Sequence, residues 1–209
     1  LALFLNQKLR GISFYRTIYF IPVVSSMVAV ALMWRWIYNP TSGILNYSLS
    51  RLFAMLHLNI TPPDWLQSTT WAMPAIIIMS VWKGLGYNMV LYLAALQGIP
   101  RHLYEAAELD GATGWKKLVH ITLPLLTPTT FFVLLMSIIG SFQVFDQAYV
   151  MTRGGPVRAT VTTMYYIYEN GFQWYKMGYA SAVAWVLFAI IMVMTLIQWK
   201  YQERWVFYG

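Results

Sequence analysis

The sequence predicts an all-α protein, a polytopic transmembrane helical bundle, and two observations carry that prediction. Hydrophobic residues make up 59% of the chain and charged residues only 10%, whereas an ordinary soluble domain is about 25% charged. The apolar residues also gather into long uncharged runs, without the apolar and polar alternation of membrane β-barrel strands. Because a bilayer offers the backbone no hydrogen-bonding partner, such runs cross it as helices.

Four spanning segments are expected, at about residues 17–38, 71–98, 125–146 and 178–200. A helix needs about 20 apolar residues to cross the bilayer core. Uncharged runs of 18, 28 and 23 residues occur at 17–34, 118–145 and 177–199. The segment 71–98 is interrupted at its middle by Lys83-Gly84-Leu85-Gly86. Since each half would be too short to cross alone, we expect one kinked span there.

Residues 1–209 are expected to form one membrane domain that is truncated at its N-terminus. Residues 1–5 are apolar, with no methionine, and residues 6–16 after them are polar and basic. A signal peptide has the opposite order, with its positive charge ahead of the apolar stretch. Residues 1–5 are therefore interpreted as the last turn of a helix. After the first span, residues 39–43 have turn chemistry, and residues 45–58 could form a short interfacial helix.

The distribution of basic residues predicts the orientation in the membrane, because cytoplasmic loops carry an excess of Lys and Arg. With 7–16, 98–124 and the C-terminus on one side, that side holds eight basic residues: Lys8, Arg10, Arg16, Arg101, Lys116, Lys117, Lys200 and Arg204. The other side holds four: Arg51, Arg153, Arg158 and Lys176. The loop 99–124 is therefore expected to be cytoplasmic. The basic cytoplasmic loops of a membrane protein account for the net charge of +7. This charge therefore does not indicate a nucleic-acid partner.

The polar loop between the second and third spans contains residues that typically start and end helices, and they predict two short helices. Pro100 suits the first turn of a helix, and residues 101–110 follow as a short amphipathic helix. Gly111 stands where a left-handed residue is needed at a helix end. Thr113 can cap a second helix over about 114–120, ending ahead of Pro124.

The spelling of this loop is Glu105-Ala106-Ala107, three residues, Gly111, nine residues, Ile121, one residue, Leu123-Pro124. It resembles the EAA loop of ABC-importer permeases, through which the membrane subunit contacts its ATPase. The resemblance implies that the coupling residues are Glu105, Ala106, Ala107, Asp110, Gly111, Ile121, Leu123 and Pro124. An ordinary solvated connecting loop is the alternative. A DNA-binding helix-turn-helix is disfavoured, because the acidic residues of the first helix would face phosphate.

Three further segments resemble carbohydrate-importer permeases: residues 6–17 with Pro22, Leu93-Ala94-Ala95-Leu96-Gln97-Gly98-Ile99-Pro100, and Phe142-Gln143-Val144-Phe145-Asp146 followed by Gly154-Gly155-Pro156 and Thr160. The resemblance implies a type I ABC-importer permease core in a bacterial or archaeal plasma membrane. This chain would keep the end of its second helix and the following four. It also implies a second permease subunit in a heterodimer, two ATPase subunits and an external solute-binding protein.

Polar residues within the spans predict a substrate passage. Lys83 lies near mid-membrane, where a charge costs about 2.5–3.5 kcal/mol, so it should face protein or a water-filled cavity. Interrupted helices often line transporter binding sites. The passage residues are expected to be Trp82, Lys83, Tyr87, Asn88, Gln143 and Asp146. The alternative is that the glycines serve helix packing and that Lys83 pairs with a carboxylate of the partner subunit.

The predicted function is passage of a sugar from the binding protein across the membrane. The sequence has no Gly-x-x-x-x-Gly-Lys-Ser/Thr loop, so ATP and Mg²⁺ are expected on the ATPase subunits and no cofactor on this chain. No catalytic or metal-ligating constellation is found, and the chain is not expected to be an enzyme. Alternatives are a permease of the same architecture for glycerol phosphate or another small solute, and an ion-driven secondary carrier without an ATPase.

Overall fold

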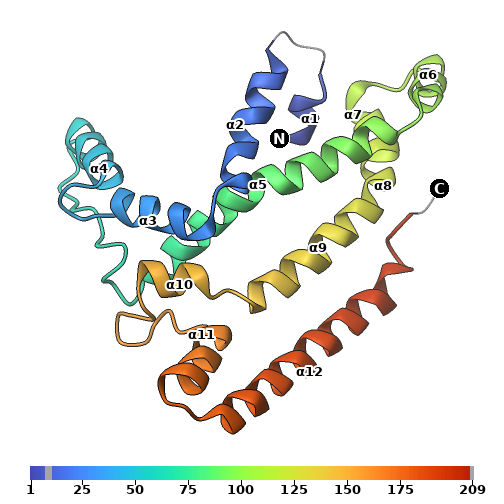
Figure 1. Ribbon diagram of the computed structural model, residues 1–209. Coiled ribbons are helices and arrows are strands. Elements are labelled where there is room, and N and C mark those ends of the chain that lie inside the picture. The colour runs from blue at the N-terminus through green and yellow to red at the C-terminus, as the bar shows by residue number, and fades with distance from the viewer. Residues whose placement is uncertain (8–10, 208–209) are drawn as a thin grey trace. The chain divides into compact units, whose positions relative to one another are not determined.

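The computed structural model describes residues 1–7 and 11–207, and over these ranges the chain is helical without any β-strand (Figure 1). The predicted all-α class is confirmed. Two helices are each long and apolar enough to cross a membrane, α5 (Ala72–Gly98) and α12 (Met177–Gln202). The short helix α1 (Ala2–Leu5) agrees with the helical turn expected at the start of the sequence.

Two more segments have the length and composition of a span only as bent pairs of helices. Helices α2 (Ile12–Val24) and α3 (Met27–Ile37) meet at 102°, and the helical stretch Gly114–Leu125 meets α9 (Thr127–Phe142) at 57°. The break between α2 and α3 was not expected, although Pro22 inside α2 and Ser25-Ser26 are residues at which helices commonly bend. The four spans and their bounds stay a prediction.

Helix α5 continues through Lys83-Gly84-Leu85-Gly86 without a break. The loosened backbone expected at these glycines is therefore wrong, and the lining of a cavity by this segment stays a prediction. Each glycine lowers helix stability by about 1 kcal/mol relative to alanine. Unpaired backbone groups cost several kcal/mol each in an apolar environment. The continuous helix is thus the less costly conformation.

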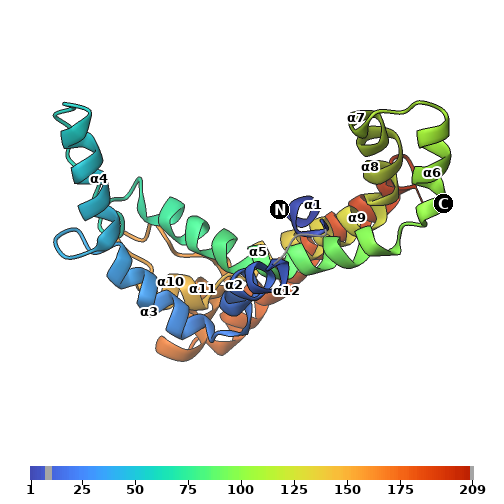
Figure 2. The ribbon, with the colours of Figure 1, turned by 90° about the horizontal axis from the view of Figure 1, so that it is seen from above.

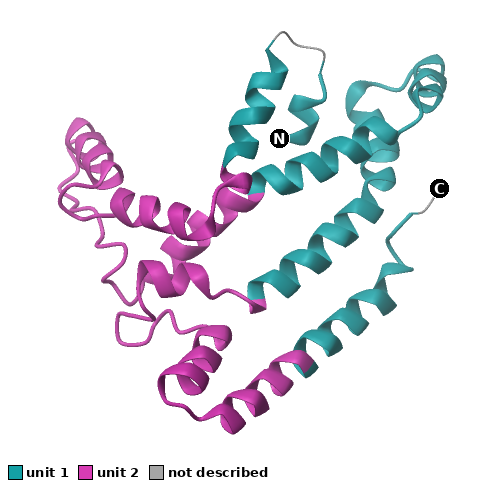
Figure 3. Ribbon diagram, in the orientation of Figure 1, with its two compact units in different colours: residues 1–21, 85–141, 189–209 teal, residues 22–84, 142–188 magenta. Residues whose placement is uncertain are grey.

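The chain divides into two compact units (Figure 3). Unit 1 comprises residues 1–21, 85–141 and 189–209, and unit 2 comprises residues 22–84 and 142–188. The core of unit 1 centres on Leu96, Ile99 and Leu126. The larger core of unit 2 joins α3, the start of α5, α10 (Asp146–Met151) and α11 (Thr163–Tyr168), through Val30, Ala31, Tyr38, Trp65, Ala75, Ile76, Met79, Ala148, Met151 and Tyr165.

The connection from α3 to α5 in unit 2 is ordered by side-chain hydrogen bonds. The Asn39 side-chain oxygen accepts from the backbone N–H groups of Thr41 and Ser42 at 3.0 and 2.9 Å, which forms the expected turn. Helix α4 (Ile44–Met55) follows, close to the interfacial helix expected at 45–58. Buried Trp65 donates to the Asn46 side chain at 2.7 Å. The connection between α3 and α5 is therefore ordered and packs into the core of unit 2.

Candidate functional site

The loop between α5 and α9 contains α6 (Arg101–Leu109) and α7 (Gly114–Lys117). A π-helical turn (Leu118–Thr122) and α8 (Leu123–Leu125) follow α7 directly. Helices α6, α7 and α8 lie together within unit 1, as Figures 1 and 2 both show. Two short helices were expected here. The second is longer than the expected 114–120, because the helical backbone passes through the π turn and Pro124 before it ends at Leu125.

Gly111 ends the first helix in the left-handed conformation predicted for it, with a φ of +74°. Its N–H donates to the Glu108 carbonyl at 3.0 Å, and the next N–H, of Ala112, donates to the Ala107 carbonyl at 2.8 Å. These two bonds form a Schellman motif, which satisfies carbonyls at a helix end. Thr113 occupies the cap position of α7, but its side chain makes no capping hydrogen bond.

Two side-chain contacts tie α6 to the helical stretch after it. The hydroxyls of Tyr104 and buried Thr122 are hydrogen bonded at 2.9 Å. The Lys117 ammonium and the Glu108 carboxylate form an ion pair at 2.6 Å, with the Glu108 side chain 64% exposed. Glu108 already has a partner within the loop, whereas the exposed Glu105 and Asp110 have no ion-pair partner among the described residues.

The predicted coupling residues divide into an outward and an inward set. Glu105, Ala106, Asp110, Gly111 and Leu123 are exposed, and Ala107 is half-buried. Ile121 and Pro124 are half-buried and line an apolar hollow of about 300 Å³ together with Leu103, His120, Leu125 and Phe207. The inward pair therefore supports the loop, and the exposed residues form the surface that another protein can reach.

Two exposed apolar residues beside the coupling positions were not predicted as site residues. Leu109 is 90% exposed and Trp115 is 73% exposed. A large apolar side chain that is left in water often marks a protein contact. The signal in the sequence was their occurrence in an otherwise polar loop. We define the coupling face as Glu105, Ala106, Leu109, Asp110, Gly111 and Trp115.

The predicted passage residues fall in both units. Tyr87 is exposed and Asn88 half-buried in unit 1, whereas Gln143 and Asp146, both exposed, belong to unit 2. Trp82 packs against the unit 2 core, with its ring 5.5 Å from that of Trp34 in an edge-to-face arrangement. Its ring thus contributes to a protein core.

Lys83 was expected to face either protein or a water-filled cavity, and it faces protein. Its ammonium donates to the backbone carbonyls of Pro22 at 2.8 Å and Ser25 at 2.7 Å, with Val23 at 3.5 Å. These carbonyls lie at the end of α2 and in the break before α3. The partner of Lys83 is therefore the backbone of its own chain, although a partner-subunit carboxylate was the alternative.

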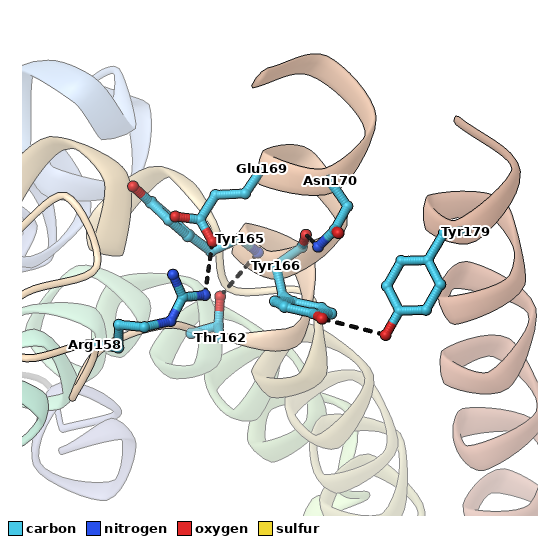
Figure 4. Close-up of polar contacts among 7 residues, drawn as sticks. All are labelled: Arg158, Thr162, Tyr165, Tyr166, Glu169, Asn170 and Tyr179. Atoms are coloured by element: carbon cyan, nitrogen blue, oxygen red, sulfur yellow. Dashed lines mark hydrogen bonds and ion pairs between the residues drawn. The ribbon is translucent and has the colours of Figure 1, made fainter. Parts of the chain in front are cut away.

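The segment between α10 and α12 is held by a polar network within unit 2 (Figure 4). The Arg158 guanidinium pairs with the buried carboxylate of Glu169 at 2.8 Å. The Thr162 hydroxyl accepts from the Tyr165 N–H at 3.2 Å. Burial raises the pKa of the Tyr165 phenol above its usual value, and Glu169 raises it further. Sequence reasoning did not identify Glu169, a charged residue that is buried because it is paired.

Residues 1–207 match the family described as "Binding-protein-dependent transport system inner membrane component". The chain is 36% identical over 96% of its length to the arabinooligosaccharides transport system permease protein AraP of Bacillus subtilis (strain 168). It is 34% identical over 100% of its length to the sn-glycerol-3-phosphate transport system permease protein UgpA of Agrobacterium fabrum. It spans 63% and 69% of the lengths of these relatives.

A solved structure shares the fold. It is that of a bacterial alginate ABC transporter in complex with its alginate pentasaccharide-bound periplasmic protein. The similarity has a TM-score of 0.85 at 27% sequence identity, and it covers 97% of this chain and 69% of the chain in that structure. The chain therefore belongs to the binding-protein-dependent transport system inner membrane components, among the ABC permeases for sugars and related solutes.

Proposed function

We propose that this chain is the membrane-spanning permease subunit of an ATP-driven importer for a sugar. The observation that carries the proposal is the loop 99–124. Most residues of its Glu105-Ala106-Ala107 and Gly111 pattern are exposed, and Gly111 ends helix α6 in the left-handed conformation. An ATPase subunit would dock on the coupling face. The proposed assembly has a second permease subunit, two ATPase subunits that bind ATP and Mg²⁺, and an external solute-binding protein.

The structure of the loop supports a role in transmitting force. Moving a two-state gate from 1:99 to 99:1 takes about 5.5 kcal/mol of differential interaction, so the transmitting element must resist deformation. The Schellman motif at Gly111 and the Tyr104–Thr122 hydrogen bond fix α6 relative to the helical stretch after it. That stretch reaches α9 with only Leu126 between them. A push on the coupling face would therefore reach a predicted span directly.

The hydrogen-bond partners of Lys83 favour a sugar over an anionic solute as the substrate. A phosphate or carboxylate in the passage would call for positively charged partners. The Lys83 ammonium has backbone carbonyls as its partners. The relative named for arabinooligosaccharides supports an uncharged sugar. Alginate is an acidic polysaccharide, so the alginate transporter supports a carbohydrate but not its lack of charge. The relative named for glycerol phosphate keeps that solute as the second candidate.

The proposed orientation places the loop 99–124 in the cytoplasm of a bacterial or archaeal cell, with the chain in the plasma membrane. The excess of Lys and Arg on that side supports it. Two of the eight basic residues counted there, Lys8 and Arg10, lie outside the described residues.

The test is ATPase activity of the full-length protein, co-purified with its encoded neighbours and reconstituted in lipid nanodiscs. The binding protein is added, and mono- and oligosaccharides are compared with glycerol phosphate. Stimulation by one sugar is expected. Stimulation only by glycerol phosphate would keep the importer and overturn the sugar. An intact, folded protein that co-purifies with no ATPase would contradict the importer and favour an ion-driven carrier.

A further inference from the structure

The break between α2 and α3 leaves backbone groups that need partners. Helix α2 ends at Val24, α3 begins at Met27, and the two helices meet at 102°. The last four carbonyls of a helix have no partner within it. In the apolar part of a membrane each unsatisfied carbonyl costs several kcal/mol. A bend of this size within a predicted span is therefore stabilised by a hydrogen-bond donor that reaches these carbonyls from outside α2.

Lys83 is that donor. Its ammonium lies 2.8 Å from the Pro22 oxygen, 2.7 Å from the Ser25 oxygen and 3.5 Å from the Val23 oxygen. An ammonium carries three N–H donors, which matches this set of acceptors. The carbonyls at the C-terminal end of a helix also carry the negative end of its dipole, which favours a cation.

The arrangement has the chemistry of a monovalent-cation site. In transporters with broken helices, carbonyls at the ends of half-helices coordinate Na⁺. Here the same type of oxygen set surrounds a tethered ammonium. The ion pairs among the described residues are Lys117–Glu108 and Arg158–Glu169, so Lys83 is held by backbone oxygens without a carboxylate partner in that part of the chain.

We propose that the carbonyl oxygens of Pro22, Val23 and Ser25 form a monovalent-cation site whose built-in occupant is the Lys83 ammonium, and that Lys83 is the positioning residue that holds the α2–α3 bend. The bent span keeps its geometry without a dissolved ion. Removing the ammonium leaves an empty site that an alkylammonium ion or Na⁺ can fill, so the test is run in choline chloride buffer without added Na⁺ or K⁺. The proposal concerns the bend itself, and only its activity readout rests on the proposed transport function.

The test uses the full-length complex in nanodiscs with Lys83→Met, Lys83→Ala and Lys83→Arg. Spin labels on Phe14→Cys and Trp36→Cys, both at exposed positions in α2 and α3, report the bend independently of transport. Lys200→Ala, at the end of α12, is the control for loss of a lysine. Lys83→Met is expected to broaden the distance distribution and to lower sugar-stimulated ATPase activity about tenfold or more, the equivalent of losing one hydrogen bond to a charged group.

Chemical rescue separates the cation site from simple packing. Propylammonium replaces the atoms that Lys83→Ala removes, and it should restore the narrow distance distribution and most of the activity. Tetramethylammonium has no N–H donor and should restore neither. Lys83→Arg, which keeps donors, should hold the bend. An unchanged distance distribution in Lys83→Met, absence of rescue by propylammonium, or equal rescue by tetramethylammonium would each overturn the proposal. A normal bend response in an inactive complex would instead count against the transport function.

Discussion

Replacing Gly111 with valine should uncouple ATP hydrolysis from transport. Gly111 has a φ of +74°, and a Cβ built there meets no atom within 4 Å, so the cost is conformational and not steric crowding by neighbours. A left-handed conformation costs an L-residue roughly 1–2 kcal/mol, and a β-branched residue adopts it still less readily. About 2 kcal/mol shifts the turn population roughly 30-fold, and it is a large part of the roughly 5.5 kcal/mol that gating requires.

The conformational penalty acts on the two hydrogen bonds that end α6. If residue 111 leaves the left-handed region, the bonds from residues 111 and 112 to the carbonyls of Glu108 and Ala107 cannot both form. The α6 helix then loses its fixed position relative to α7, while the spans and membrane insertion are unaffected. We therefore expect normal expression, retained ATP hydrolysis and a lower number of sugar molecules transported per ATP.

The assay is sugar uptake and ATP hydrolysis measured together in proteoliposomes. Two variants serve as matched controls. Gly111→Asn should retain most of the coupling, because asparagine tolerates the left-handed region. Gly114→Ala lies three residues away at a helical position with no atom within 4 Å of a Cβ, and should behave as the wild type. Equal transport per ATP in Gly111→Val and Gly114→Ala would refute the reasoning.

Three smaller predictions test other parts of the account. Tyr104→Phe removes the hydrogen bond to Thr122 and should destabilise the loop by about 0.5–1.5 kcal/mol, measured as faster hydrogen exchange in α6; unchanged exchange would contradict the tie. Glu108→Gln removes an exposed ion pair and should change thermal stability by about 0–1 kcal/mol; a larger loss would mean that this pair matters more than its exposure indicates. Asn88→Leu and Tyr87→Leu should alter uptake or its substrate dependence without detaching the ATPase; unaffected uptake in both would remove them from the passage.

The parts of the fold that sequence could predict are those specified by neighbouring residues. The uncharged runs gave the helical class, and Pro100 and Gly111 gave the start and end of α6 to within one residue. Here the determining interactions, such as the bonds of the Schellman motif, join residues that are close in the chain. The residues that mark helix ends in the sequence therefore lie where α6 starts and ends in the structure.

The features that sequence could not predict depend on distant partners. The α2–α3 bend is held by Lys83, 58–61 residues further along the chain, and no local pattern connects the two. Tryptophan is a residue type that can stack on a sugar, which is why Trp82 was predicted to line the passage. Its observed contact with the Trp34 ring follows from tertiary packing, which the sequence does not reveal. The roles of the coupling and passage residues remain predictions, because they depend on contacts with other molecules.

Site-directed cross-linking tests the central claim that the loop 99–124 docks the ATPase. These 209 residues contain no cysteine, so single cysteines can be introduced cleanly at Ala106 on the coupling face and at Val157, which is 90% exposed in the expected external segment. In the complete complex, Ala106→Cys should cross-link to an ATPase subunit in a manner that changes with bound nucleotide, and Val157→Cys should not. Absence of an ATPase cross-link from Ala106→Cys, or equal cross-linking from both positions, would contradict the account.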